Sequence, residues 1–152
     1  LPERPLDGLS ILLAEDDEIN RLMLESNLLD DGARLVMVGD GAAAVERVRQ
    51  DGPDAYDVVL MDVQMPGMDG FEASRRIRHI APELPIIGQT AHAFNEDRDR
   101  CLAAGMADYI AKPIDPSALV RMLLKVTARR RAVTVSGASD ASQGPGRGGD
   151  VP

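Results

Sequence analysis

Residues 58–62 have the sequence VVLMD, in which an unbroken apolar run ends at the carboxylate of Asp62. Such a run is typical of a parallel strand that helices cover on both faces, because a half-exposed strand would alternate apolar with polar residues. Four other short apolar runs predict further buried strands. They lie at residues 11–14, 35–38, 85–87 and 109–111.

Amphipathic segments separate these runs and predict helices. In the first segment, Ile19, Leu22, Met23 and Leu29 form one apolar stripe, and Gly32 ends the pattern. The other helices are expected over residues 41–50, 71–80 and 95–104, and after the N-cap signal Asp115-Pro116, where the buried stripe consists of Leu119, Val120, Leu123 and Val126.

Five strands that alternate with five helices predict an α/β fold, a doubly wound five-stranded parallel sheet. The flavodoxin-like form of this fold has strand order 2-1-3-4-5, with its switch point between the first and third strands. Residues 9–131 are expected to form this one domain. Residues 1–8 are interpreted as a linker, and residues 132–152, which lack hydrophobic periodicity, as a flexible C-terminal tail.

The composition excludes several classes of partner. The formal net charge of −8 would repel a nucleic-acid backbone, and the basic residues 129–131 are interpreted as a solvated helix end. No apolar run approaches the roughly 18 residues that a membrane span needs, so we expect neither nucleic acid nor direct membrane contact. The single cysteine, Cys101, excludes an internal disulfide and indicates a reducing compartment. The first residue is Leu1 instead of Met, which suggests a piece of a longer protein.

Carboxylates follow the two predicted strands that meet at the switch point. Glu15, Asp16 and Asp17 end the first strand, and Asp62 ends the third. Two carboxylates about 4 Å apart repel by roughly 4 kcal/mol at an effective dielectric of about 20, so their assembly favours a bound cation. An all-oxygen ligand set selects Mg²⁺ or Mn²⁺. Asp17 is better explained as the N-cap of the following helix, which leaves the other three as candidate ligands.

Two further polar residues follow the remaining central and edge strands. Thr90 follows the fourth predicted strand and Lys112 the fifth, so both are expected at the same edge of the sheet. An ammonium group neutralises charge on phosphoryl oxygens, and a hydroxyl donates a hydrogen bond to them. The set therefore indicates phosphoryl chemistry. His79 and His92 lack metal-ligand spacing and a partner nucleophile, and we interpret them as surface or loop residues.

Four fragments, in order and at fixed spacing, carry a family resemblance. They are residues 12–20 (LLAEDDEIN), residues 60–70 (LMDVQMPGMDG), Thr90-Ala91 and Lys112-Pro113. From residue 11 to about residue 126, the chain resembles the receiver domains of response regulators in two-component systems. The sequence of residues 15–20 is most similar to receivers at the C-terminus of hybrid sensor histidine kinases.

The resemblance implies a phosphoacceptor domain of a phosphorelay, in which Asp62 takes a phosphoryl group from a phosphohistidine in a Mg²⁺-dependent reaction. Asp16 would ligate the metal directly, and Glu15 would ligate it or support it through water. The main-chain carbonyl of Gln64 would supply another ligand. Such a domain promotes its own phosphorylation and dephosphorylation while acting mainly in signalling.

The resemblance also implies a conformational response. Lys112 would pair with Asp62 or its phosphoryl group, Thr90 would move to hydrogen-bond that group, and Tyr109 would turn inward when Thr90 moves. The Lys112-Pro113 peptide bond would be cis. The implied partner is the dimerisation and phosphoacceptor domain of a histidine kinase or a histidine phosphotransfer protein, with a phosphorylation-dependent dimer as a further form. The implied location is the cytoplasm, either free or as the cytoplasmic part of a membrane-anchored kinase.

Two positions depart from the family pattern. Glu15 stands where Asp is more frequent, and its longer side chain leaves open whether it binds the metal directly or through water. Gly88-Gln89 places a flexible and a polar residue in a strand that is usually apolar. Gln89 therefore needs a polar partner or a position at an edge.

Three other functions remain open from the sequence. A haloacid-dehalogenase-like phosphatase also uses a strand-end Asp and Mg²⁺, but it needs a second acid where Gln64 stands. A flavodoxin-type FMN carrier needs a hydroxyl- and glycine-rich phosphate loop after the first strand, where the acidic residues 15–17 would repel phosphate. A receiver used only for docking is disfavoured by the complete set of Glu15, Asp16, Asp62, Thr90 and Lys112.

Overall fold

The apolar run VVLMD forms β3 (Val58–Asp62), the central strand of a five-stranded parallel sheet. The structure is a computed structural model that describes residues 3–91 and 95–128. The observed order, β2-β1-β3-β4-β5, confirms the predicted flavodoxin-like topology. The other strands are β1 (Ser10–Ala14), β2 (Arg34–Val38), β4 (Ile86–Thr90) and β5 (Asp108–Ala111).

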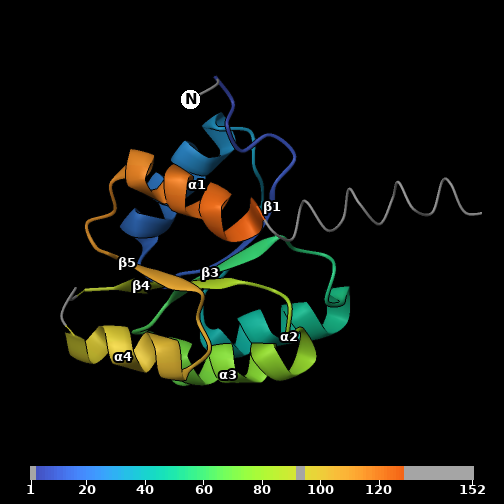
Figure 1. Cartoon of the computed structure of the whole chain (residues 1–152), viewed down its shortest axis with the longest axis vertical. Coiled ribbons are helices and arrows are strands. Elements are labelled where there is room, and N and C mark those ends of the chain that lie inside the picture. Colours follow the sequence, from blue (N-terminus) through green and yellow to red (C-terminus); the bar gives the residue numbers. More distant parts are fainter. Residues whose placement is uncertain (1–2, 92–94, 129–152) are drawn as a thin grey trace, which may run out of the picture.

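Helices cover both faces of the sheet, as right-handed crossovers require (Figure 1). One face carries α1 (Glu18–Asp30) and the C-terminal helix, residues 116–128. The opposite face carries α2 (Gly41–Asp51), α3 (Gly70–Ile80) and α4 (Asn95–Ala103). The five predicted helices are therefore present, each within a few residues of its expected bounds.

Aspartate side chains begin most of these helices by accepting a backbone N–H of the first turn, which would otherwise have no partner. Asp17 accepts from the N–H of Asn20 at 3.0 Å, which confirms its interpretation as an N-cap. The same arrangement joins Asp40 to Ala43, Asp69 to Glu72 and Asp115 to Ala118. These caps fix where each helix leaves the loop that follows the carboxyl end of a strand.

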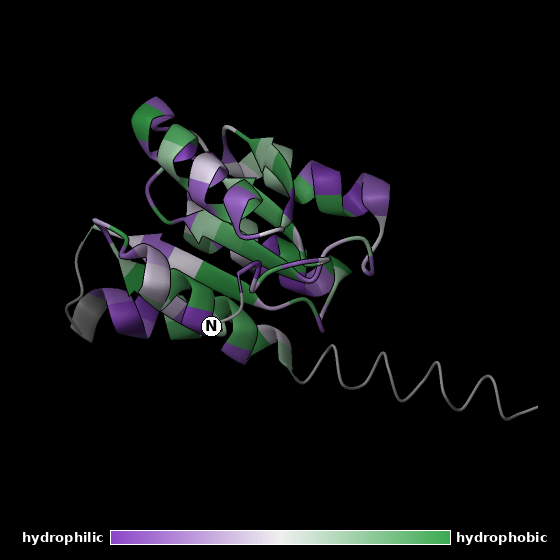
Figure 2. Ribbon diagram, turned by 90° about the horizontal axis from the view of Figure 1, so that it is seen from above, coloured by the Kyte–Doolittle hydropathy of each residue, from purple (hydrophilic) through white to green (hydrophobic). Residues whose placement is uncertain are grey.

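Two aliphatic layers form the core, one on each face of the sheet. In Figure 2 the central strands are mostly hydrophobic, and the helices around them carry both hydrophobic and hydrophilic residues. Successive residues of a strand point to opposite faces, so neighbours in sequence belong to different layers. Leu12 and Val59 pack toward α2, α3 and α4, whereas Leu13 and Leu60 pack toward α1 and the C-terminal helix. No helix among the described residues combines the length and the apolar character that a membrane span requires.

The two edge strands correct the expectation that every strand is fully buried. β1, β3 and β4 lie inside the sheet and are almost wholly buried, but most residues of β2 and β5 are only half-buried. An edge strand has a neighbour on one side only, and the helices cover it less completely. The apolar residues of β2 still pack against both core layers, Val36 and Val38 on one face and Leu35 and Met37 on the other.

The apolar stripe predicted for the first helix is not its buried face. Ile19, Leu22 and Met23 are exposed by 70%, 60% and 51%, whereas Leu24 and Leu28 are buried. At about 100° per residue, positions 24 and 28 share one side of the helix and positions 19, 22 and 23 lie roughly opposite. The helix carries apolar residues on both sides, and the prediction that this stripe is buried is wrong because it faces solvent.

The N-terminal segment packs on the domain. Leu6 and Leu9 are fully buried, and the N–H of Leu6 donates to the carbonyl of Asp31 at 2.9 Å. Part of the expected linker thus contributes to the core, while the boundary at residue 9 stays a prediction. The expected tail, the basic residues 129–131 and His92 lie outside the described residues.

Candidate functional site

Three carboxylates gather at the carboxyl edge of the sheet because β1 and β3 are neighbours. One ligand oxygen from each of Glu15, Asp16 and Asp62 lies within 4.8 Å of the other two. Glu15 and Asp62 are buried, with 0% and 2% of their surfaces exposed, and Asp16 is exposed. The expected acidic cluster is therefore present, with Glu15 and Asp62 buried and Asp16 open to solvent.

Lys112 reaches the same carboxylates from the loop that follows β5. Its Nζ lies 3.0 Å from Oδ2 of Asp62 and 3.3 Å from Oε1 of Glu15. Burial by itself lowers the pKa of Lys112, but the hydrogen bond that it donates to Asp62 and the charges of both carboxylates outweigh burial and raise the pKa above its usual value. Lys112 therefore remains an ammonium group that offsets part of the negative charge.

The carboxyl group of Asp62 is strongly perturbed. Burial first, and then the hydrogen bond and charge of the adjacent Glu15 carboxyl, raise its pKa from 3.8 to about 7 in all. Hydrogen bonds from the backbone N–H of Gln64, at 3.0 Å, and from Lys112 offset part of this effect. A buried carboxylate with a raised pKa in a cluster of charged groups is a mark of a functional site.

Glu15 is held by donors from three parts of the chain. The backbone N–H of Asp17 donates to its Oε2 at 3.0 Å, and the side-chain amide of Asn20 and the ammonium of Lys112 contact its Oε1. The same Asn20 amide also donates to Oε1 of Gln89 at 3.3 Å. Gln89 is fully buried, and Asn20 is the polar partner that its side-chain oxygen needs. The Nε2 of Gln89 has no hydrogen-bond partner among the described residues.

The Thr90 side chain lies on the other face of the sheet. Gln89 points toward α1, so the next residue points toward α4, where the Thr90 hydroxyl donates to Oδ2 of Asp97 at 2.6 Å. Its main-chain carbonyl accepts the N–H of Lys112 at 2.8 Å. The structure thus brings the backbone of Thr90 next to the site and directs its hydroxyl away from the carboxylates.

Tyr109 lies on β5 opposite Gly88 of β4 and is half-buried against the core layer under α4. It therefore shares a face of the sheet with Thr90. The peptide bond between Lys112 and Pro113 is cis, as the family resemblance implied. The roles of Thr90 and Tyr109 as a switch stay predictions.

The donor set suits a hard divalent cation. It consists of carboxylate oxygens only, and the buried pair within it destabilises its own ionised form, as the raised pKa of Asp62 shows. The backbone of Gln64 lies beside the cluster, since its N–H contacts Asp62. Glu15, Asp16 and Asp62 could therefore hold Mg²⁺, and the carbonyl of Gln64 remains the predicted further ligand.

This fold and this edge of carboxylates and lysine define a class of protein: a flavodoxin-like α/β domain with an acidic, lysine-containing site at the carboxyl edge of its sheet. The chain belongs to the response regulator receiver domain family, which it matches over residues 11–124. It is a receiver domain of two-component systems.

The curated relatives are sensor kinases that are much longer than this chain. It is 43% identical to the sensor protein GacS of Pseudomonas syringae pv. syringae over 122 residues, which is 77% of the chain and 13% of GacS. It is 38% identical to hybrid signal transduction histidine kinase L of Dictyostelium discoideum over 120 residues, which is 76% of the chain and 7% of that kinase. The chain thus spans a small part of these relatives.

Solved structures of receiver domains superpose on the chain. The receiver domain of a sensor histidine kinase from Pseudomonas aeruginosa, crystallised with a magnesium ion coordinated in its active site cleft, is 40% identical and has a TM-score of 0.73. The match covers 80% of this chain and 98% of that one. A second match comes from the crystal structure of the Saccharomyces cerevisiae phosphotransfer protein Ypd1 with the receiver domain of Ssk1. Its identity is 26% and its TM-score 0.74, and the match covers 82% of this chain and 92% of that one.

No role was predicted from the sequence for two residues that contact the candidate site residues, Asn20 at Glu15 and Asp97 at Thr90. Asn20 lies one helical turn after the acidic residues, and its helical position next to Glu15 was the available signal. Asp97 lies in the first part of α4, where residues 95–100 are all polar, so no pattern distinguished it from the other acidic residues of that helix.

Proposed function

We propose that this receiver accepts a phosphoryl group from a phosphohistidine onto Asp62 in a reaction that requires Mg²⁺. The observation that carries the proposal is the Asp62 carboxylate, which is 2% exposed, contacts Lys112 at 3.0 Å, and lies with Glu15 and Asp16 inside one ligand cluster. A bound Mg²⁺ would supply positive charge for the carboxylates and for the phosphoryl oxygens.

The chain's own residues position the reacting groups. A carboxylate oxygen of Asp62 attacks phosphorus, the new P–O bond forms as the P–N bond to imidazole breaks, and the released imidazole takes up a proton. Gln64 N–H and Lys112 hold the two carboxylate oxygens in fixed directions before reaction. Lys112 then lies close to the transferred group, where its ammonium can neutralise charge that develops on the phosphoryl oxygens.

The new contacts would favour a different conformation. A phosphoryl group adds nearly two negative charges and three acceptor oxygens. Hydrogen bonds from Thr90 and Lys112, at about 1.5–3 kcal/mol each, together provide about 3–6 kcal/mol before the loss of their present contacts with Asp97 and Asp62 is subtracted. Moving a two-state population from 1:99 to 99:1 takes about 5.5 kcal/mol, so the net gain shifts the population in part. Tyr109, on the same face as Thr90, is the predicted companion of that shift.

The exposed apolar side of α1 is the proposed docking surface for the phosphodonor. Ile19, Leu22 and Met23 lie in the first turns of α1, directly after the acidic residues 15–17. A receiver homologous to this chain crystallised with a histidine phosphotransfer protein, which makes that class of protein, or the corresponding domain of a histidine kinase, the proposed partner. The buried free thiol of Cys101 agrees with action in the cytoplasm.

Intact-mass spectrometry after incubation with acetyl phosphate tests the phosphoacceptor role. One Mg²⁺-dependent adduct is expected in the wild type and in Asp7→Asn, a control at an exposed carboxylate, and none in Asp62→Asn. Peptide mapping should place the adduct on Asp62. An adduct that persists in Asp62→Asn, or that ignores removal of Mg²⁺ by EDTA, would contradict the proposal.

The docking surface is tested by comparing Leu22→Asp with Leu102→Asp, an equally exposed leucine on α4. Both variants should react normally with acetyl phosphate. Transfer from phosphorylated Ypd1 should slow by about tenfold in Leu22→Asp alone, which corresponds to about 1.4 kcal/mol. Equal rates in both variants would place the donor elsewhere.

A further inference from the structure

The hydroxyl of Thr90 already has a strong acceptor on α4. Its Oγ1 donates to Oδ2 of Asp97 at 2.6 Å, and Thr90 is fully buried while Asp97 is half-buried. A hydrogen bond to an ionised acceptor is shorter and stronger than one between neutral groups. This bond therefore ties the carboxyl end of β4 to α4.

That bond competes with the contact that phosphorylation requires. A hydroxyl carries one proton and can donate it in one direction at a time. Under the function proposed above, Thr90 donates this proton to the phosphoryl group on Asp62, which lies with Gln89 on the α1 side of the sheet. Thr90 must therefore release Asp97 before it can hold the phosphoryl group.

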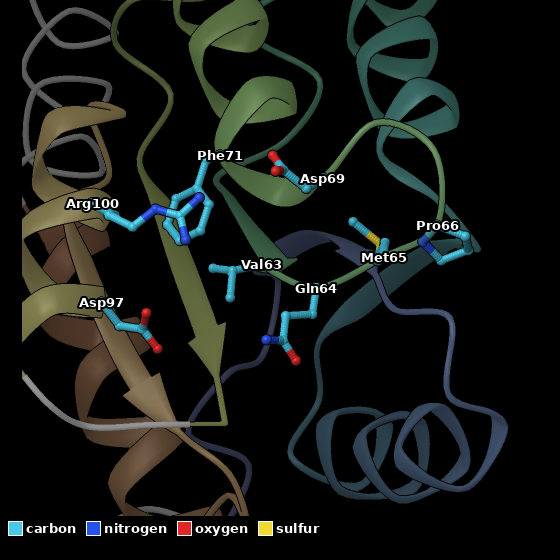
Figure 3. A pocket seen from close by; sticks show the side chains of 8 residues that line it. All are labelled: Val63, Gln64, Met65, Pro66, Asp69, Phe71, Asp97 and Arg100. Atoms are coloured by element: carbon cyan, nitrogen blue, oxygen red, sulfur yellow. The ribbon is translucent and has the colours of Figure 1, made fainter.

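The surroundings of Asp97 allow this release. Asp97 lines a cavity of about 380 Å³ together with Arg100 of α4 and with Val63 and Gln64, which follow β3 (Figure 3). Within the described part of the chain, Asp97 forms no salt bridge that would hold it in place. Once Thr90 turns away, the carboxylate can take up water in this open space, so no buried charge is left without a partner.

We propose that Asp97 is a positioning residue that holds Thr90 in the unphosphorylated arrangement and thereby sets how readily the domain adopts the phosphorylated one. Asp97 acts through Thr90 and does not touch the phosphoryl group. The inference rests on the proposed function, since it assumes that Thr90 serves the phosphoryl group on Asp62. It assigns to an acidic residue of α4 the control of the balance between the two states.

Beryllofluoride with Mg²⁺, a stand-in for the phosphoryl group, is the probe for this balance. Removal of the competing acceptor in Asp97→Ala should tighten apparent beryllofluoride binding by about 5- to 30-fold, the factor that corresponds to one or two kcal/mol. Asp97→Asn keeps a neutral acceptor and should fall between the wild type and Asp97→Ala. Asp99→Ala, which removes an exposed charge from the same helix, should bind like the wild type.

A second arm separates the hydrogen bond from simple charge repulsion, because a carboxylate near the site would repel an anion in any case. In a Thr90→Ala background, Asp97→Ala should change beryllofluoride binding by less than about 2-fold. The methyl resonance of Thr90 in unphosphorylated Asp97→Ala should also move toward its position in the beryllofluoride-bound wild type. Circular dichroism checks that each variant is folded. If Asp97→Ala unfolds, beryllofluoride binding and the Thr90 resonance are compared between the wild type and Asp97→Asn.

The outcomes are distinguishable. Wild-type protein that binds no beryllofluoride and takes no phosphoryl group from acetyl phosphate would overturn the proposed function, and the role of Asp97 with it. A responsive wild type with unchanged binding and an unchanged Thr90 resonance in Asp97→Ala would overturn the role of Asp97 alone. An equal gain with and without Thr90 would reduce that role to charge repulsion.

Discussion

Replacement of Asp62 by Asn should stabilise the metal-free protein, although it removes the residue on which the proposed chemistry depends. The structure buries Asp62 beside Glu15 and raises its pKa from 3.8 to about 7. Asn resembles the protonated side chain in shape and carries no charge. The variant therefore removes a carboxylate whose ionised form opposes folding.

The sign and the size follow from proton linkage. Between pH 3.8 and about 7 the folded state binds a proton on Asp62 that the unfolded state does not, so stability falls as pH rises through this interval. The interval spans about three pH units, and at about 1.36 kcal/mol per unit the full effect is roughly 4 kcal/mol. Asp62→Asn should be about 2 kcal/mol more stable than the wild type at about pH 5.5, and about 4 kcal/mol more stable at about pH 8.

Urea unfolding followed by circular dichroism in EDTA measures these differences. Titrating groups far from Asp62 are common to both proteins and cancel, so the difference reports Asp62 together with its contacts to Glu15 and Lys112. Asp7→Asn, a control at an exposed carboxylate, should stay within about 0.5 kcal/mol of the wild type at both pH values. Added Mg²⁺ should stabilise the wild type more than Asp62→Asn at the higher pH. An advantage that is absent, or that shrinks as the pH rises, would refute the reasoning.

Three further predictions concern Lys112 at the site, Gly88 of β4 and Cys101 of α4. Lys112→Met leaves two buried carboxylates without their ammonium, and it should lower the free energy of unfolding by about 2–3 kcal/mol in urea titrations, less than the loss of a fully buried partner because the lysine is 28% exposed. Gly88→Ala would place a methyl group 2.6 Å from the sulfur of Met106 and should cost about 1–3 kcal/mol, whereas Gly39→Ala, with 3.7 Å of space, should change stability little in the same assay. Burial raises the pKa of Cys101 to about 11, so iodoacetamide should label it only after unfolding, and rapid labelling of the native protein would contradict its place in the core.

The sequence predicted the sheet well because parallel strands leave a strong signal. Strands β1 and β3 contain continuous apolar runs, and the polar residues at or just after the ends of β1, β3 and β5 mark the edge where such folds place their sites. The carboxylates of Glu15 and Asp62 and the ammonium of Lys112 could be brought together on this basis alone. The strand order alone places these three groups at the same edge of the sheet.

What the sequence could not predict depends on side-chain direction. Leu22 and Leu24 are equally apolar, and only tertiary packing decides that the second is buried while the first faces solvent. The polar partner that Gln89 needs could not be named from the sequence, because that partner, Asn20, lies 69 residues away. The choice of Asp97 as acceptor for Thr90 similarly depends on how α4 packs against β4.

The alternation of side chains along β4 has a consequence for how such a domain can evolve. Gln89 joins Asp62 and Asn20 on the α1 side, and Thr90 joins Asp97 on the α4 side, although the two residues are adjacent in the chain. Under the proposed function, substitutions on α1 would alter which donor is recognised and leave the contact between Thr90 and Asp97 in place. Substitutions on α4 would change the response and leave the proposed docking surface intact. A step of one residue along β4, from Gln89 to Thr90, thus separates the face proposed for donor recognition from the face proposed for the response.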